Sequence, residues 1–196
     1  AFIERQQLSP YDSTIRAWAD SIGWDWRMLA AVIYTESKFA INVTSGAGAR
    51  GLMQIMPLTV RVYNVQDVLN PEENIRAGAS YLGRLDRLFR KYASGDERLR
   101  YVFASYNAGE TRVLRYLNGT PEDEVSDSAL NADIDSAAME GLRADIDSAS
   151  VAGPPATKSP DPSEPAPASP EINTSVTAYV DKIFENYRNF CRICGK

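Results

Sequence analysis

The pattern of apolar and polar positions predicts helices in the first part of the chain. A Ser-Pro pair with an acidic residue three positions after the serine is typical of a helix start, so we expect a helix from Ser9 to about Ile22. Asp25 can cap a second helix that runs from Trp26 to about Ser37. The middle of this second helix, residues 28–33, is apolar, which is typical of a helix that is buried on all sides.

Helical spacing recurs along the rest of the chain. Residues 42–57 contain four glycines or prolines and are expected to form a loop. The further expected helices are Pro57 to Val62, Asn70 to about Tyr92, Glu97 to Asn107, Thr111 to Leu117, and a last helix that begins near Ser175. No stretch shows convincing alternation with a period of two, so the sequence predicts an all-α fold.

The composition changes at Thr120. Between Thr120 and Glu171 there are 12 acidic and two basic residues, and residues 153–170 hold 7 of the chain's 11 prolines. Such a composition is typical of an extended, disordered segment. The expected organisation is a main part of one domain over 1–119, an acidic, Pro-rich and partly disordered insertion over 120–172, the last helix over 173–190, and a tail over 191–196.

Charge and residue types narrow the expected partners. Of the 21 basic and 26 acidic residues, 19 and 14 lie outside the acidic segment, and this mildly basic body suits an anionic polymer. The basic residues are scattered, so nucleic acid is not an expected partner. Cys191 and Cys194 cannot fill a zinc site in a chain without histidine, and we expect a local disulfide or free thiols. Asp-Ile-Asp repeats in the insertion lack the glycine and final glutamate of a calcium loop, so we expect no metal and no cofactor.

Glu36 is the first candidate for chemistry. It lies in the last turn of the apolar helix, where the helix dipole disfavours a carboxylate. Apolar surroundings and the dipole would both raise its pKa. An isolated glutamate at such a position is more often a paired structural charge, so its position alone does not establish a catalytic role.

Four blocks of sequence occur in the order of a known family. They are Glu36-Ser37, the stretch SGAGARGLMQIMPLT from Ser45 to Thr59, the Asn-Pro, Asn-Ile, Gly and Tyr-Leu pattern from Asn70 to Leu82, and Ser105-Tyr-Asn-Ala-Gly109. This ordered set resembles family 1 lytic transglycosylases, the soluble lytic transglycosylase type, over about residues 9–117 and again from near 175. The start of the chain is similar to the C-terminal catalytic module of membrane-bound members, which carry another domain ahead of it.

One position departs from this family pattern. The family usually places Glu-Thr four and three residues before the Tyr-Val pair of the last helix. Here Ser175 and Val176 precede Tyr179-Val180 at those positions. The insertion over 120–172 also interrupts the pattern between the Tyr-Asn-Ala-Gly helix and the last helix.

The resemblance implies a goose-lysozyme-like α-helical fold. The implied reaction cleaves the β-1,4 bond between N-acetylmuramic acid and N-acetylglucosamine of peptidoglycan and leaves a 1,6-anhydromuramyl end. Glu36 would be the catalytic acid and base. The resemblance also implies a substrate site. In it, Ser37 and Ser45 would orient Glu36 or the substrate, Gln54 would hydrogen-bond the sugar, and Met56 would line the floor beneath the muramic ring. Tyr106 would reach the catalytic carboxyl, and Asn107 would bond an N-acetyl group or the loop.

The distribution of acidic residues fits a mechanism with one carboxylate. Ordinary glycosidases use a second carboxylate as a nucleophile or as a base for water. After Glu36 no acidic residue occurs until Asp67. A transglycosylase needs no activated water, because the attacking group is the C6 hydroxyl of the sugar itself. Such intramolecular attack can lower the barrier by about 7–11 kcal/mol.

Two other functions stay open at this point. A goose-type lysozyme, a hydrolase on the same fold, would leave reducing ends. A non-catalytic cell-wall-binding module would not depend on Glu36. The expected partner is a peptidoglycan glycan strand, with a regulatory domain ahead of this stretch as a further possibility. No signal-peptide pattern opens the chain, which we interpret as a mature or trimmed sequence, and the resemblance implies a periplasmic, outer-membrane-associated protein.

Overall fold

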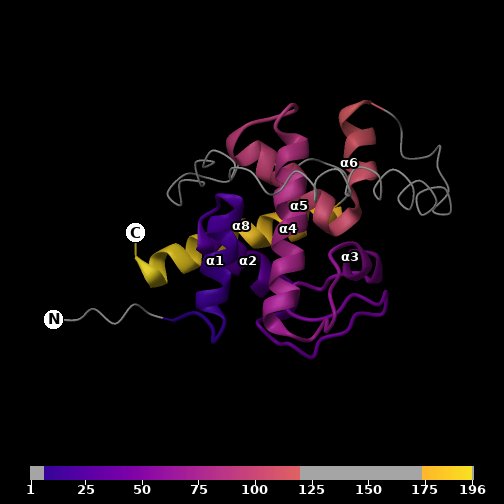
Figure 1. The fold of residues 1–196 in the computed structure, drawn as a ribbon. Coiled ribbons are helices and arrows are strands. Elements are labelled where there is room, and N and C mark those ends of the chain that lie inside the picture. Colours follow the sequence, from indigo (N-terminus) through magenta and orange to yellow (C-terminus); the bar gives the residue numbers. More distant parts are fainter. Residues whose placement is uncertain (1–6, 120–173, 196) are drawn as a thin grey trace.

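The computed structural model describes residues 7–119 and 174–195, and these residues form a bundle of helices (Figure 1). The helices are α1 (Asp12–Ile22), α2 (Trp26–Ser37), α3 (Pro57–Val62), α4 (Pro71–Phe89), α5 (Gly95–Ala108), α6 (Glu110–Leu117) and α8 (Thr174–Cys194). The only other regular pairing in the described residues consists of two isolated antiparallel bridges, Thr44 with Arg50 and Arg50 with Ile55. The predicted all-α fold class is therefore confirmed, whereas the predicted insertion lies outside the described residues.

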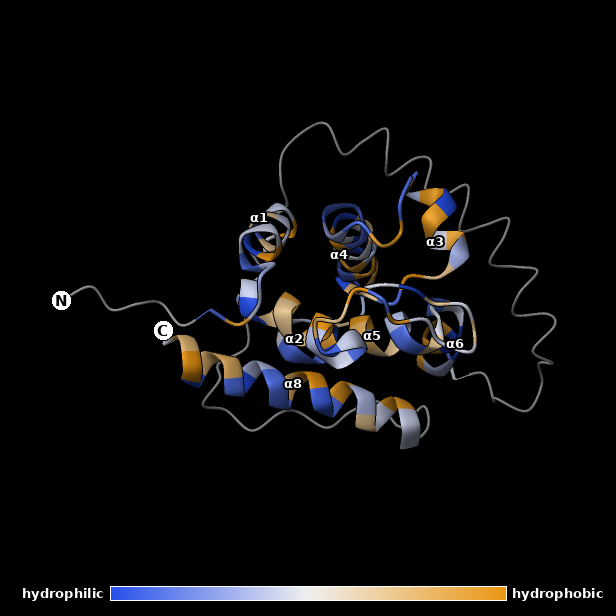
Figure 2. Cartoon of the chain, turned by 90° about the horizontal axis from the view of Figure 1, so that it is seen from below, coloured by the Kyte–Doolittle hydropathy of each residue, from blue (hydrophilic) through white to orange (hydrophobic). Residues whose placement is uncertain are grey.

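Helix α2 lies at the centre of the bundle. It packs against α1 and α8, and α5 contacts α4, α6 and α8. Figure 2 shows α8 on one side of α2 and α5, with α4 on the other side. The apolar residues 28–33 of α2 are at most 1% exposed, which confirms that this helix is buried. The buried α2 carries Glu36 in its last turn, so the rigid centre of the fold positions this carboxyl.

Three hydrogen bonds join α8 to α2 along its length. The Tyr179 hydroxyl donates to Glu36 Oε1, the Asn186 amide donates to Thr35 Oγ1 at 2.9 Å, and the Tyr187 hydroxyl donates to Asp25 Oδ2 at 3.3 Å. An ion pair at 2.8 Å between the buried Arg100 of α5 and the half-exposed Asp181 also attaches α8 to α5. Together these contacts fix the position of α8 along α2, and thereby the position of Tyr179 beside Glu36.

Several helix ends differ from their predicted positions. Helix α1 begins at Asp12, and its N-cap is Tyr11 instead of the predicted Ser9. Ser9 and Asp12 of the predicted start do bond each other, because the Asp12 carboxylate accepts hydrogen bonds from the Ser9 backbone N–H and hydroxyl. Helix α4 ends at Phe89 instead of Tyr92. Phe89 is the last residue of α4 in the core, and Tyr92 is exposed, so tertiary packing no longer supports the helix beyond Phe89.

The C-terminal segment corrects another expectation. Residues 191–194 continue α8 instead of forming a tail, because Phe190 and Cys191 are buried against the bundle. Both cysteines are free thiols, which decides between the two alternatives left by the sequence. No helix in the described ranges has the length and apolar character needed to cross a membrane.

Candidate active site

Glu36 lies where α2 ends in a tight left-handed turn. The next two residues after Ser37, Lys38 and Phe39, have positive φ angles of 55° and 64°, and the Lys38 N–H donates to the Tyr34 carbonyl at 3.0 Å. Such angles are uncommon for residues other than glycine, and they occur often at functional sites. A left-handed residue is a common way for a helix to end, and here it turns the chain sharply just after Glu36.

The Glu36 carboxyl is partly buried and has one protein partner in the described residues. The Tyr179 hydroxyl donates to its Oε1 at 2.5 Å. Burial raises the pKa of Glu36 from 4.5 to about 7, against the opposing effect of this hydrogen bond. A carboxyl with a pKa near 7 is present in both protonation states at neutral pH, so it can donate a proton and then accept one.

Within residues 7–119 and 174–195, no second carboxylate is among the groups that shift the pKa of Glu36. No three Cys, Asp or Glu side chains in those ranges are grouped so that they could hold a metal ion. The Glu36 carboxyl is thus a group that can supply proton transfer at this position.

Asn74 of α4 holds the loop over residues 40–56 in place. The buried Asn74 side chain accepts a hydrogen bond from the Met53 N–H at 2.8 Å and donates to the carbonyls of Arg50 and Val68. A Cβ at Gly51 would lie 2.3 Å from the Asn74 amide nitrogen, and Gly51 has a φ of 79°. A glycine is therefore required at this position, where the loop passes directly over Asn74.

Gln54 and Met56, two predicted substrate-binding residues, lie on this loop. Gln54 has a positive φ of 48°, and its side-chain amide donates to the carbonyls of Gly51 and Val43 at 2.9 and 3.1 Å. Its amide nitrogen is thus engaged in holding the loop together. Met56 is 43% exposed, which is unusual for a large apolar side chain and leaves its surface available for contact with a ligand.

Tyr106 differs from its predicted role. Its hydroxyl donates to the Met53 carbonyl at 2.8 Å and not to Glu36, because α8 supplies the hydroxyl that reaches the carboxyl. Burial and the nearby charge of Glu36 raise the pKa of Tyr106 well above its ordinary value, so its ring does belong to this region. The structure therefore places Tyr106 as a support for the loop beside Gln54.

The remaining predicted residues fall into two groups. Ser37 donates to the Ile33 carbonyl at 3.2 Å, and the Ser45 hydroxyl accepts from the Ala49 N–H at 3.0 Å, so both serines bond the local backbone instead of Glu36. Asn107 is exposed near the end of α5. Sequence reasoning missed Tyr179 as a site residue, although the Tyr-Val pair of the last helix carried the signal.

The arrangement of helices matches solved structures of lytic transglycosylases. An inactive variant of the lytic transglycosylase Slt from Pseudomonas aeruginosa is 22% identical with a TM-score of 0.56, and the match covers 93% of this chain and 24% of that chain. The 70 kDa soluble lytic transglycosylase from Escherichia coli is also 22% identical, with a TM-score of 0.55 and the same coverage. The fold is therefore the lysozyme-like all-α fold, as the sequence predicted.

The sequence comparison identifies the family. The model of the family described as "Transglycosylase SLT domain" matches residues 13–128, more than half of the chain, so this chain belongs to that family. A curated relative from Desulfosudis oleivorans, named "Membrane-bound lytic murein transglycosylase F", is 40% identical over 107 residues, which are 55% of this chain and 24% of the relative. A relative of the same name from Yersinia pseudotuberculosis is 38% identical over 50% of this chain and 21% of its own length. The matched stretch is thus less than a quarter of these relatives.

Proposed function

We propose that this domain is a lytic transglycosylase that cleaves the β-1,4 bond between N-acetylmuramic acid and N-acetylglucosamine in peptidoglycan. Membership of the family and the names of its relatives support this class of activity. The observation that carries the proposal is Glu36, a partly buried carboxyl whose pKa is raised to about 7. An acid of this strength is suited to donating a proton to a glycosidic oxygen at neutral pH.

The proposed mechanism uses Glu36 twice. The neutral carboxyl donates its proton to the glycosidic oxygen as the bond from muramic acid C1 to that oxygen breaks, and N-acetylglucosamine leaves with a free 4-hydroxyl. The C6 hydroxyl oxygen of the same muramic acid then forms the new bond to C1, and its proton passes to the Glu36 carboxylate. The products are an anhydro ring and a regenerated neutral acid, and no water is consumed.

Tyr179 supports the first step of this mechanism. Its hydroxyl donates to Glu36 Oε1, so it favours the carboxylate that forms after the first proton transfer. Burial raises the pKa of Tyr179 well above its ordinary value, and the negative charge of Glu36 acts in the same direction. Tyr179 therefore stays neutral and remains a donor throughout the reaction.

The substrate would lie against the exposed side of the loop. We assign the floor of the sugar site to Met56, whose exposed side chain can contact the apolar face of a sugar ring. Asn107 is exposed and has an amide of the kind that pairs with an N-acetyl group. Gln54 shapes the loop through its side-chain amide nitrogen, and we assign to its side-chain oxygen a hydrogen bond to the sugar. Ser37, Ser45 and Tyr106 act through the backbone that they hold.

Product analysis tests the proposal. Purified peptidoglycan is digested with the wild type, with Glu36→Gln, and with the matched control Glu97→Gln, a surface glutamate on α5 that pairs only weakly with Tyr101. Mass spectrometry should find 1,6-anhydromuramyl ends with the wild type and the control. Loss of the acid should lower the rate by at least about 100-fold.

The same experiment separates the alternatives. Reducing ends without anhydro ends would establish a goose-type hydrolase, and no cleavage products from either the wild type or Glu36→Gln would favour a non-catalytic binding module. We further propose that the longer protein acts in the periplasm at the outer membrane, in line with the words "membrane-bound" in the names of the relatives. Fractionation of the envelope, followed by detection of the protein, tests this location.

A further inference from the structure

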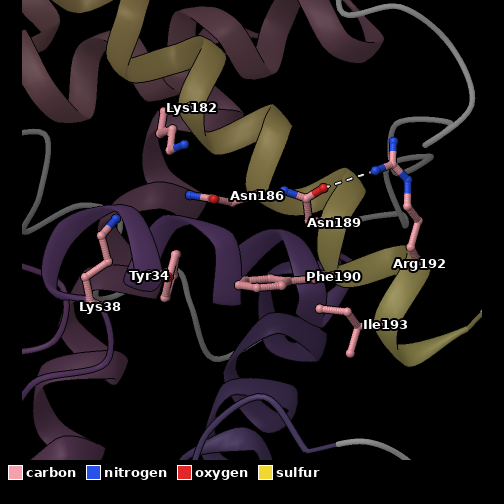
Figure 3. Close-up of a pocket in the computed structure, with 8 residues that line it drawn as sticks. All are labelled: Tyr34, Lys38, Lys182, Asn186, Asn189, Phe190, Arg192 and Ile193. Carbon is pink, nitrogen blue, oxygen red and sulfur yellow. Dashed lines mark hydrogen bonds between the residues drawn. The ribbon is translucent and has the colours of Figure 1, made fainter.

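A groove of about 690 Å³ lies between the end of α2 and the outer face of α8, separate from the loop beside Glu36. Figure 3 shows Tyr34 and Phe190 next to one another along it, with Lys38 and Lys182 near one end and Arg192 toward the other. The ring centroids of Tyr34 and Phe190 are 5.6 Å apart, and Ile193 beside them is 46% exposed. The groove thus combines an apolar floor with cations at its ends.

The charges of the groove have one sign. Among the described residues that line it, three are cationic and none is acidic. The Lys182 ammonium is 2.9 Å from Glu185, but both side chains are about half exposed, so this ion pair is weak and leaves donors available. Arg192 donates one N–H to Asn189 at 3.2 Å and retains its other donors for a ligand. Such a surface favours an anionic ligand, and carboxylates are one group with which its cations can pair.

The spacing of the cations sets the length of that ligand. Lys182 and Arg192 are ten residues apart on α8, a rise of about 15 Å along the helix axis. An extended peptide covers about 3.3 Å per residue, so four residues cover about 13 Å. A short peptide with carboxylates near both ends, and small apolar side chains between them, matches both the cations and the apolar floor.

The groove also begins close to the proposed catalytic carboxyl. Lys38 follows Glu36 by two residues, and Lys182 lies one helical turn after Tyr179, whose hydroxyl contacts Glu36. One helical turn is about 5 Å long. The groove thus starts within a few residues of the proposed catalytic carboxyl on α2 and of its partner Tyr179 on α8.

We propose that this groove binds the carboxylate-bearing peptide attached to muramic acid, so that the domain recognises the peptide of its polymer as well as the glycan. This inference rests on the proposed function, because it takes peptidoglycan as the substrate. The lysines and Arg192 pair with the peptide carboxylates, and Tyr34, Phe190 and Ile193 contact its small apolar side chains.

The kinetic test compares two substrates. One is glycan strands that carry their peptides, and the other is the same strands after enzymatic removal of the peptides. The test variant is Lys182→Gln combined with Arg192→Gln, which removes two groove charges from exposed positions. The control is Lys91→Gln combined with Arg61→Gln, which removes the same charge from exposed positions outside the groove.

The groove variant should raise KM for peptide-bearing strands about five- to tenfold, as expected for two partly exposed ion pairs, and leave kcat unchanged. Its KM for peptide-free strands should equal that of the wild type, and the control should behave like the wild type on both substrates. An equal change on both substrates, or no change on either, would overturn the inference. A wild type that makes no anhydro ends from either substrate would instead refute the proposed function.

A binding measurement distinguishes the polymer peptide from the other source of carboxylates, the acidic residues between Thr120 and Glu171 of this chain. The probe is a soluble synthetic tetrapeptide with the wall sequence, titrated into the wild type, the groove variant and a variant that lacks residues 121–170. Equal affinity for the wild type and the deletion variant, with weaker binding to the groove variant, supports the proposal. A tenfold gain of affinity after deletion would show that the chain's own acidic segment occupies the groove, and would overturn it.

Discussion

Replacing Glu36 with glutamine should stabilise the folded domain at neutral and alkaline pH but not in acid. The folded-state pKa of Glu36 is raised from 4.5 to about 7. In the unfolded chain the carboxyl loses its proton near pH 4.5, whereas in the folded domain it keeps the proton until about pH 7. The folded state therefore holds more protons between these values, and the free energy of unfolding of the wild type falls as the pH rises through this window.

The magnitude follows from the same pKa values. One pKa unit corresponds to about 1.4 kcal/mol, so the rise from 4.5 to about 7 corresponds to about 3 kcal/mol. Below pH 4.5 the carboxyl is neutral in both states and contributes nothing. Above pH 7 the folded domain holds a poorly solvated carboxylate, and the free energy of unfolding is lowered by the full amount. Glutamine has no charge to bury and keeps an oxygen that can accept the Tyr179 hydroxyl, so it avoids this cost.

The assay is urea denaturation of the wild type and Glu36→Gln at pH 4, 6 and 8. Taking the difference between the two proteins at each pH removes the contribution of all other titrating groups, and Glu97→Gln serves as the exposed control. Relative to the wild type, the free energy of unfolding of Glu36→Gln should be little changed at pH 4 and higher by about 3 kcal/mol at pH 8. A difference that does not change with pH, or that favours the wild type at pH 8, would refute the reasoning that burial raises the pKa of Glu36.

Three further changes test other parts of the site. Tyr179→Phe removes the hydrogen bond that lowers the pKa of Glu36, so the alkaline limb of the pH profile of kcat/KM should move to higher pH; an unchanged limb would contradict the contact. Asn74→Ala leaves the Met53 N–H and two carbonyls without their partner and should lower the free energy of unfolding by about 3 kcal/mol, measured in urea; a loss under about 1 kcal/mol would mean that water replaces the amide. Gly78→Ala places a Cβ 2.4 Å from the Met53 sulfur and should cost about 1–3 kcal/mol in the same assay; an unchanged free energy of unfolding would contradict this and mean that Met53 moves aside freely.

The helices could be predicted because their signals are local. Asp25 caps α2 as expected, with its side chain accepting from the Arg27 N–H, and Asn70 caps α4 by accepting from the Glu73 N–H. The predicted end of α4 was wrong by three residues, because the helix ends where Phe89 packs in the core and the local sequence pattern does not show this. Helical periodicity specifies which face is apolar, but tertiary packing determines where the helix stops.

The candidate site was predictable only in part. Glu36 could be found because the motif and the apolar helix both lie close to it in sequence. The tyrosine that contacts it could not be chosen from local sequence, since Tyr106 and Tyr179 were both available and the packing of α8 decided between them. Likewise, the serines bond nearby backbone groups whose positions depend on the turn after Ser37 and on the loop after Ser45.

The long separation between Glu36 and Tyr179 has a consequence for the order in which the site is made. The ribosome synthesises Glu36 143 residues before Tyr179, so the growing chain contains the carboxyl long before it contains the hydroxyl that lowers the pKa of that carboxyl. Only the arrival and docking of α8 complete the pair. Closure entropy grows slowly with the number of residues between two points of a chain, by about 0.6 kcal/mol for each doubling. The contact between Glu36 and Tyr179 therefore depends more on how α8 packs against α2 than on how many residues separate the two in sequence.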